Sequence, residues 1–154
     1  MTKITDDHYG LYIGGKWITP AGASLITAEN PSNGDALATF VDATHADVDA
    51  AVLAARNAFP TWKKVDVVSR SKMLLEIADL IDANKERLAM IETLDNGKPI
   101  RETSSVDVPF SADHFRYFAG VIRAEEGSVK DFDEDTLSII LKEPIGVVGQ
   151  IVPW

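Results

Sequence analysis

Few side chains in this sequence have the types and spacing that catalysis or metal binding requires. The histidines His8, His45 and His114 lie far apart with no partner at ligand spacing, which argues against a zinc site. Glu125 and Glu126 are adjacent and on a helix would not face one another, which argues against a glycosidase-like carboxylate pair. The sequence contains no cysteine, so it holds neither a disulfide nor a thiol nucleophile.

Two other stretches have only a superficial likeness to ligand-binding motifs. Residues 131–135, Asp-Phe-Asp-Glu-Asp, lack the spaced oxygen ligands, the glycine and the terminal Glu of a calcium loop, so they predict a solvated turn. The pair Gly14-Gly15 is followed by no helix start, and it predicts a hairpin turn between strands at 11–13 and 16–18 rather than a phosphate cradle. No Gly-x-Ser-x-Gly, Walker or Rossmann glycine motif is present.

One carboxylate, Asp95, lies where a helix is predicted to end, in the run Glu-Thr-Leu-Asp-Asn-Gly-Lys-Pro at 92–99. Gly97 can adopt the left-handed conformation of a helix C-cap, and Pro99 prevents the helix from continuing. Lys98 suits the negative end of the helix dipole. A single carboxylate is not a metal motif, so the residues alone predict a plain helix end.

Four helices and several small strands must position these residues. Thr44 and Asp47 form a predicted capping box, Pro60 is predicted to end that first helix, Asn84 to cap the third, and the fourth to begin between Ser104 and Asp107 with Pro109 in its first turn. Helical spacing predicts inward stripes at Val48, Val52, Ala55 and Phe59; Leu74, Ile77, Ala78 and Ile81; Leu88, Ile91 and Leu94; and Val108, Ala112, Phe115, Ala119 and Ile122. Strands are predicted at 24–30 and 36–42, joined through Asn33-Gly34, and at 136–143.

The last stretch, residues 145–152, is almost wholly apolar and rich in β-branched side chains. This composition predicts a strand covered on both faces, of the kind found inside a parallel sheet, and therefore an α/β fold. Such a strand needs neighbouring strands and covering helices. We expect the chain to be the front part of a larger α/β protein and to do little alone.

Composition excludes some classes of partner. The chain has 154 residues, of which 45% are hydrophobic, and a formal net charge of −9. Nucleic acids and anionic membranes are bound by clustered Lys and Arg, so we expect neither as a partner. Residues 1–7 are polar and acidic, unlike a signal peptide, and no apolar run approaches membrane-spanning length, so we expect a cytoplasmic protein.

The closing run Glu143-Pro-Ile-Gly-Val-Val-Gly-Gln-Ile-Val-Pro-Trp154 resembles the strand that leads into the active site of the NAD(P)-dependent aldehyde dehydrogenase superfamily. The runs at 98–110 and 113–119 look most like the bacterial acetaldehyde and short-chain aliphatic aldehyde dehydrogenases. The resemblance implies that residues 1–126 are the amino-terminal part of the NAD(P)-binding domain, with β-hairpins and four helices. It implies an oligomerisation ribbon at 127–143 and the first strand of a Rossmann-like core, cut short, at 144–154.

The resemblance also implies roles for six residues. Ile151, Val152, Pro153 and Trp154 would line the nicotinamide end of the NAD or NADP cleft, Phe110 would form a wall of the substrate tunnel, and Asp95 would lie near a monovalent-cation site. The residues themselves leave alternatives open. The last strand is also consistent with a buried strand that stops at a proline, Phe110 with a core residue, and Asp95 with a helix end.

The function implied is the oxidation of acetaldehyde or another short aliphatic aldehyde to the carboxylic acid with NAD(P)+ by a full-length homo-oligomer, a dimer or a tetramer. No catalytic residue lies within this chain, because the family's catalytic Cys and Glu would follow Trp154, so we expect the chain alone to be inactive. The alternative is a non-catalytic truncated remnant or an oligomerisation module. The choice between NAD and NADP depends on groups near the adenosine ribose that these residues do not include.

Overall fold

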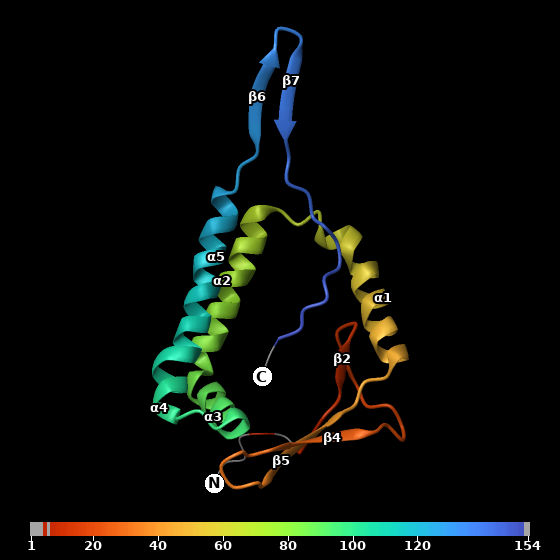
Figure 1. Ribbon diagram of the computed structural model, residues 1–154, viewed down its shortest axis with the longest axis vertical. Helices are drawn as coiled ribbons and strands as arrows, with labels where there is room; N and C mark the ends of the chain where they lie inside the picture. Colours follow the sequence, from red (N-terminus) through yellow and green to blue (C-terminus); the bar gives the residue numbers. More distant parts are fainter. Residues whose placement is uncertain (1–4, 6, 153–154) are drawn as a thin grey trace.

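The computed structural model describes residue 5 and residues 7–152. Its helices are α1 His45–Trp62, α2 Val67–Ala83, α3 Lys85–Asn96, α4 Ile100–Glu102 and α5 Val108–Ala124, with a π-helical turn, η1, at Thr103–Asp107. Its strands are β1 His8–Tyr9, β2 Leu11–Ile13, β3 Lys16–Ile18, β4 Leu25–Glu29, β5 Ala36–Val41, β6 Ser128–Asp133 and β7 Thr136–Ile140. Figure 1 shows α2 and α5 side by side, α1 on the other side of the molecule, the small strands β4 and β5 at one end and the hairpin β6–β7 projecting from the other.

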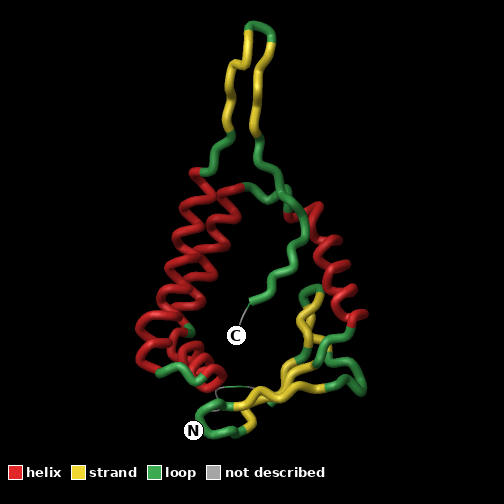
Figure 2. Tube along the Cα trace, viewed as in Figure 1, coloured by secondary structure: helices red, strands yellow, loops and turns green. Residues whose placement is uncertain are grey.

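The amino-terminal strands form two small sheets. The order of the first sheet is β1-β5-β4, with β1 parallel and β4 antiparallel to β5. The hairpin β2–β3 turns through Gly14 and Gly15, whose φ values of 60° and 80° favour glycine, and Gly34 has a φ of 77° between β4 and β5. The pairs β2–β3 and β4–β5 and their turns confirm the sequence prediction, whereas strand β1 was not predicted. Figure 2 shows them as the yellow segments gathered near the N-terminus.

Helix α1 begins at the predicted capping box but ends later than predicted. The Asp47 amide donates to Thr44 Oγ1 and the Thr44 amide to Asp47 Oδ2, at 3.3 and 2.8 Å. The prediction that Pro60 ends the helix is wrong, because the helix continues to Trp62. A proline removes only its own amide from the helical hydrogen bonds, and the Lys63 amide still donates to Phe59 O at 2.9 Å.

The predicted inward stripe of α1 has no partner in this structure. Val48 and Val52 are exposed, no residue of α1 is buried, and among the described elements α1 makes its main contact with β2. The helix forms as predicted, but the burial that was predicted for its apolar face is wrong for the described part of the chain. The physical reason is that no other described element packs along this face.

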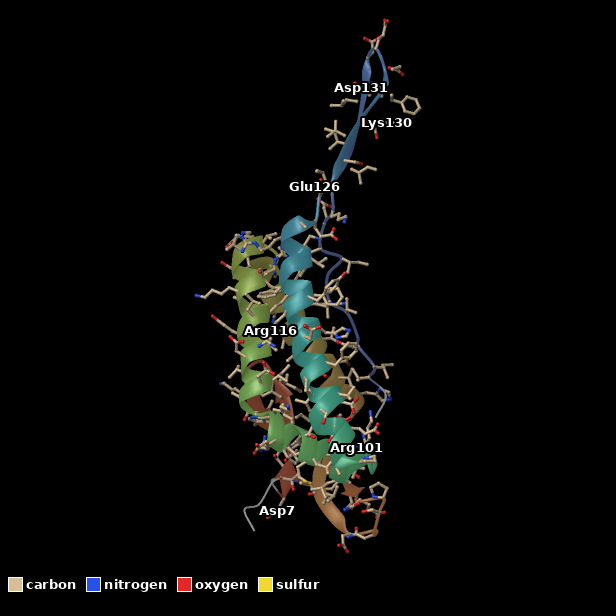
Figure 3. The ribbon with its side chains drawn as sticks, turned by 90° about the vertical axis from the view of Figure 1, so that its left-hand side faces the viewer. Asp7, Arg101, Arg116, Glu126, Lys130 and Asp131 are labelled. Atoms are coloured by element: carbon tan, nitrogen blue, oxygen red, sulfur yellow. The ribbon has the colours of Figure 1, made fainter. Side chains whose placement is uncertain are left out.

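Helices α2 and α5 form the best-packed part of the chain. Ala78 on α2 and Ala112 and Ala119 on α5 are almost fully buried, and these small side chains allow the helices to approach closely. At the surface, Arg116 donates to Asp79 and Asp82 at 2.9 and 2.6 Å, and these two hydrogen bonds, with the Asp82 bond first, raise the pKa of the Arg116 guanidinium. Figure 3 shows Arg116 on α5 beside α2.

The last helices differ from the prediction at their beginnings. Asn84 precedes α3, but its side chain donates to Leu80 O of α2 at 2.8 Å and makes no cap to α3. The chain is helical from Ile100 onward through α4 and η1 and does not begin its last helix between Ser104 and Asp107. Gly97 has a φ of 79° and ends α3 as predicted.

The hairpin β6–β7 stands free of the rest of the chain. All residues of both strands are exposed, and the hairpin joins the helices through an ion pair between Lys142 and Glu125 at its base. Val129 pairs with Ile139 in the antiparallel register, and the turn lies at Glu134-Asp135 as the acidic run predicts. The Lys130 and Asp131 labels in Figure 3 mark how far the hairpin extends beyond α5.

Residues 141–152 form no strand in this structure, so the prediction of a buried strand at 145–152 is wrong for this chain. Ile145 and Ile151 are 94% and 97% exposed. The physical reason is that a strand needs hydrogen-bonded neighbours, and no other described strand lies beside these residues. The segment runs in extended form between α1 and the α2–α5 pair (Figure 1).

No helix among the described residues is both long and apolar enough to cross a bilayer.

Candidate functional site

Asp95 lies at the end of α3, where three hollows of the surface meet. It borders an open depression of about 830 Å³ with Pro31 and Lys98, a cleft of about 380 Å³ against Val108 of α5, and a hollow of about 250 Å³ against the sheet. The carboxylate makes no hydrogen bond or ion pair within the described part of the chain. A negative charge is therefore available at a junction of the sheet, α3 and α5.

The hollow of about 250 Å³ is the one that we considered as a cation site. Its walls include Ala28 of β4 and Leu37 and Ala38 of β5 together with Asp95, so α3 and the sheet border the same space. Among the described residues no group of three His, Cys, Asp or Glu side chains could hold a metal ion. A single carboxylate is not the ligand set of a transition-metal site.

The turn that follows Asp95 is fixed by an ion pair. Lys98 Nζ lies 2.5 Å from Asp107 Oδ2; Lys98 follows the end of α3, and Asp107 is the last residue of η1. The hydrogen bond to Asp107 raises the pKa of the Lys98 ammonium, and Glu92 and Glu102 add smaller contributions of the same sign. The ion pair links the residues before α4 to the last residue of η1.

The start of η1 is fixed by a buried threonine. Thr103 is fully buried, its Oγ1 lies 2.9 Å from Thr93 Oγ1 of α3, and it also donates to Ile100 O at 3.2 Å. The Val108 amide donates to Thr103 O, five residues earlier, which is the hydrogen bond that defines a π turn. Such turns occur frequently at functional sites.

An aromatic surface lies on α5 just after this turn. Phe110 is 60% exposed, and its ring meets the His114 ring edge-on at a centroid distance of 4.2 Å. His114 Nδ1 lies 2.9 Å from Phe110 O, and Tyr117 and Phe118 continue the surface one turn later. The exposure of Phe110 excludes the interpretation that it is a core residue of the described chain.

The structure places the remaining candidates elsewhere. Ile151 and Val152 lie in the extended closing segment with exposed side chains. Pro153 and Trp154 lie outside the described residues. The three hollows at Asp95 do not include Phe110, Ile151 or Val152. The candidate residues therefore lie at three separate locations: Asp95 at the end of α3, Phe110 on α5, and Ile151 and Val152 in the closing segment.

Two contacts of this region and the burial of Thr103 were not predicted from the sequence. The opposite charges of Lys98 and Asp107 on either side of a short helical turn are a signal that could have indicated the ion pair. The spacing of Phe110 and His114, four residues apart on a helix, could have indicated their ring contact. Nothing in the sequence distinguishes Thr103 from a surface threonine.

Comparisons of the sequence and of the structure with known proteins both identify aldehyde dehydrogenases. The profile of the aldehyde dehydrogenase family matches residues 17–154. An acetaldehyde dehydrogenase of Pseudomonas aeruginosa is 49% identical over 146 residues, which cover 95% of this chain and 29% of that protein. The chain thus spans less than a third of the length of this curated relative.

Two solved structures extend the comparison. PnpE from Pseudomonas sp. WBC-3 superposes with a TM-score of 0.89 at 41% identity, over 96% of this chain and 30% of the other. A point mutant of betaine aldehyde dehydrogenase from Staphylococcus aureus, in complex with NAD+, superposes with a TM-score of 0.82 at 36% identity, over 88% of this chain and 28% of the other.

Proposed function

Because the chain belongs to the aldehyde dehydrogenase family, we propose that it is part of an enzyme that oxidises acetaldehyde or another short aliphatic aldehyde to the carboxylic acid. The observation that carries the proposal is the 49% identity to an acetaldehyde dehydrogenase over 95% of the chain. The sequence has no cysteine, so the thiol nucleophile of this chemistry is not among these residues. The chain supplies surfaces for binding and assembly.

Phe110 is our proposed wall of the substrate tunnel. Its exposed ring, braced edge-on by His114, offers an apolar surface to the alkyl part of an aldehyde. A tunnel of this kind excludes water and favours small hydrophobic substrates. The exposed aromatic side chains of Tyr117 and Phe118 on the same helix support an apolar lining.

The closing segment is our proposed contribution to an NAD or NADP site. Its residues Ile151, Val152, Pro153 and Trp154 would line the nicotinamide end of that site. The exposed apolar side chains of Ile151 and Val152 suit the face of a planar ring, and the extended backbone of 141–152 has no strand partner among the described residues. The cofactor supplies the hydride acceptor of the reaction. The NAD+ complex of the betaine aldehyde dehydrogenase supports NAD as the cofactor to test first.

Asp95 is our proposed ligand of a monovalent cation, with backbone oxygens of the neighbouring strands as the other ligands. The support is that Asp95 borders the same hollow as β4 and β5 and that its carboxylate has no hydrogen bond or ion pair among the described residues. A cation there would join the sheet to α3 and stabilise the amino-terminal strands. The proposed role is structural.

The hairpin β6–β7 is our proposed contact between subunits in a cytoplasmic homo-oligomer, a dimer or a tetramer. Its exposed apolar residues Val129, Leu137 and Ile139 support this assignment, because such side chains are rarely left in water on an isolated hairpin. An exposed strand edge pairs readily with a strand of another subunit.

The test is an assay of the full-length protein that contains these residues. Acetaldehyde, butanal and hexanal are supplied with NAD+ and then with NADP+, and the reduced nicotinamide is followed by absorbance. We expect oxidation with at least one cofactor, and no oxidation by the 154-residue chain alone. A full-length protein that oxidises none of these aldehydes would overturn the proposal.

A variant pair tests Phe110 in the same assay. The substitution Phe110→Ala removes the aromatic wall. It should raise KM for the short aldehydes by about tenfold, because the loss of an apolar contact weakens substrate binding by about that factor. The control is Tyr12→Ala, which removes an equally exposed ring from the β2–β3 hairpin. Equal changes in both variants would show that Phe110 has no specific role in the tunnel.

A further inference from the structure

The ring of Phe110 is held by a neighbour on its own helix. In an α-helix each Cα–Cβ bond tilts toward the amino terminus, so the side chain of residue 114 leans over the turn that carries residue 110. The His114 ring accordingly meets the Phe110 ring edge-on, with the ring centroids 4.2 Å apart and the ring planes at 81°. Within the described part of the chain, no other aromatic ring contacts Phe110.

The His114 ring is itself fixed by a hydrogen bond. Its Nδ1 lies 2.9 Å from Phe110 O, and a carbonyl oxygen can only accept, so Nδ1 carries the hydrogen and donates it. His114 is therefore joined to Phe110 at two points, the edge of the aromatic ring and the backbone carbonyl. Although both side chains are exposed, one holds the other in a defined orientation.

Without His114 the Phe110 ring would have a choice of orientation. Aromatic side chains on a helix populate two χ1 rotamers, near 180° and near −60°. Phe110 is 60% exposed, so packing within the described chain does not exclude either rotamer. The contact with His114 is the interaction that favours one orientation of the ring.

We infer that His114 is a positioning residue for aldehyde binding, which acts by fixing the ring of Phe110. The inference rests on the proposed function, because it takes Phe110 to be a wall of the substrate tunnel. A substrate that meets a ring already in place does not have to order that ring when it binds. Loss of His114 should therefore weaken aldehyde binding and leave the chemical step unchanged.

The experiment uses the full-length enzyme and whichever short aldehyde the wild type oxidises best. His114→Ala removes both the ring and the hydrogen bond, His114→Gln keeps a hydrogen-bond donor without a ring, and His114→Phe keeps a ring without the donor. The matched control is His45→Ala, which removes an exposed histidine from the first turn of α1. The measurements are kcat, KM and Tm for each variant.

We expect His114→Ala and His114→Gln to raise KM by about threefold and to leave kcat within about twofold, because a single aromatic pair contributes an effect of about this size. His114→Phe restores the ring contact, so its KM should stay close to the wild-type value. His45→Ala should change neither constant. A lower Tm and kcat with an unchanged KM in His114→Ala would show a purely structural role and overturn the inference.

A double-mutant cycle tests whether His114 acts through Phe110. In the Phe110→Ala background no ring is left to hold, so His114→Ala should raise KM no further. An equal rise in KM in that background overturns the inference. A KM in His114→Phe as high as that in His114→Ala also overturns it, because the ring contact would then have no role.

Three results separate this inference from the proposed function. If KM rises in Phe110→Ala but not in His114→Ala, the inference alone is overturned. If the wild type oxidises aldehydes and Phe110→Ala behaves like Tyr12→Ala, the tunnel role of Phe110 is overturned and the inference with it. A wild-type protein that oxidises none of the aldehydes overturns the proposed function and the inference together.

Discussion

The hydroxyl of Ser71 on α2 donates to the carbonyl oxygen of Ala119 on α5 at 2.7 Å, across 48 residues of sequence. Both residues are almost fully buried. Ala119 lies more than one turn before the end of α5 at Ala124, so the Ser71 hydroxyl is an additional partner of its carbonyl rather than a replacement for a missing one. The two helices are thus joined by a polar contact within an otherwise apolar interface.

Ser71→Ala should destabilise the chain by about 1–3 kcal/mol, because it leaves the Ala119 carbonyl buried with one partner fewer. Ala119→Leu should cost a similar amount, about 1–3 kcal/mol, by overfilling the same interface. Urea unfolding followed by circular dichroism measures both. Ser138→Ala on the exposed strand β7 is the control, and a Ser71→Ala variant as stable as this control would contradict the prediction.

Asp47→Asn should weaken the beginning of α1 at neutral pH but not at low pH. The hydrogen bonds from the Thr44 side chain and amide hold the pKa of Asp47 below its usual value of 3.8. The stabilisation is therefore present above about pH 3.8 and lost as the pH falls through the lower folded-state pKa. Helicity measured from pH 7 to pH 2 should show the difference between wild type and variant disappear, and a constant difference would contradict the assignment.

Asp95→Asn should abolish any effect of monovalent cations on the full-length protein. We expect the wild type to gain Tm when choline chloride is exchanged for potassium or sodium chloride at equal ionic strength, because a bound ion stabilises the folded state. Glu76→Gln, which removes an exposed charge from α2, controls for general electrostatics. A gain that persists in Asp95→Asn would place the cation elsewhere.

Gly127→Ala should open the base of the hairpin β6–β7. An added Cβ would lie 2.3 Å from Ile140 O, too close for any side chain to remain there. Amide exchange should become faster at 128–140. Gly120→Ala on α5 has free space and should be neutral or slightly stabilising, and unchanged exchange in Gly127→Ala would show that the strand ends adjust without opening.

Ile139→Lys should dissociate the proposed oligomer of the full-length protein. Ile139 pairs with Val129, and a charge on this surface would lie in the proposed subunit contact. Light scattering measures the mass. Ser138→Lys adds the same charge at the next position of β7, on the opposite face of the hairpin, and the prediction fails if both variants keep the wild-type mass.

Local chemistry made the elements predictable. Gly14-Gly15, the Thr44 capping box and Gly97 each act within a few residues, and the structure has all three where the sequence indicates them. Burial was less predictable, since the stripe on α1 and the apolar run at 145–152 both lack partners in the described chain. An apolar pattern predicts that a face is buried, but it does not identify the element that packs against that face.

The sites depended on longer-range relationships. Asp95 borders a hollow that is also lined by residues of β4 and β5 more than 50 residues away in sequence, and no local pattern indicates that relationship. The π turn was missed because Pro109 is equally consistent with a helix that begins just before it. The contact of Thr103 at the start of that turn with Thr93 of α3 is likewise one that spacing alone does not predict.

The exposed apolar faces of α1 and of residues 145–152 also determine the heat capacity change that accompanies unfolding of the 154-residue chain. The heat capacity increment of unfolding follows the apolar surface that becomes newly hydrated, and here much of that surface is already in water. The increment should fall well below the roughly 12–15 cal/mol/K per residue of ordinary domains. The stability curve would then be nearly flat with temperature, and the melting endotherm would be broad and shallow.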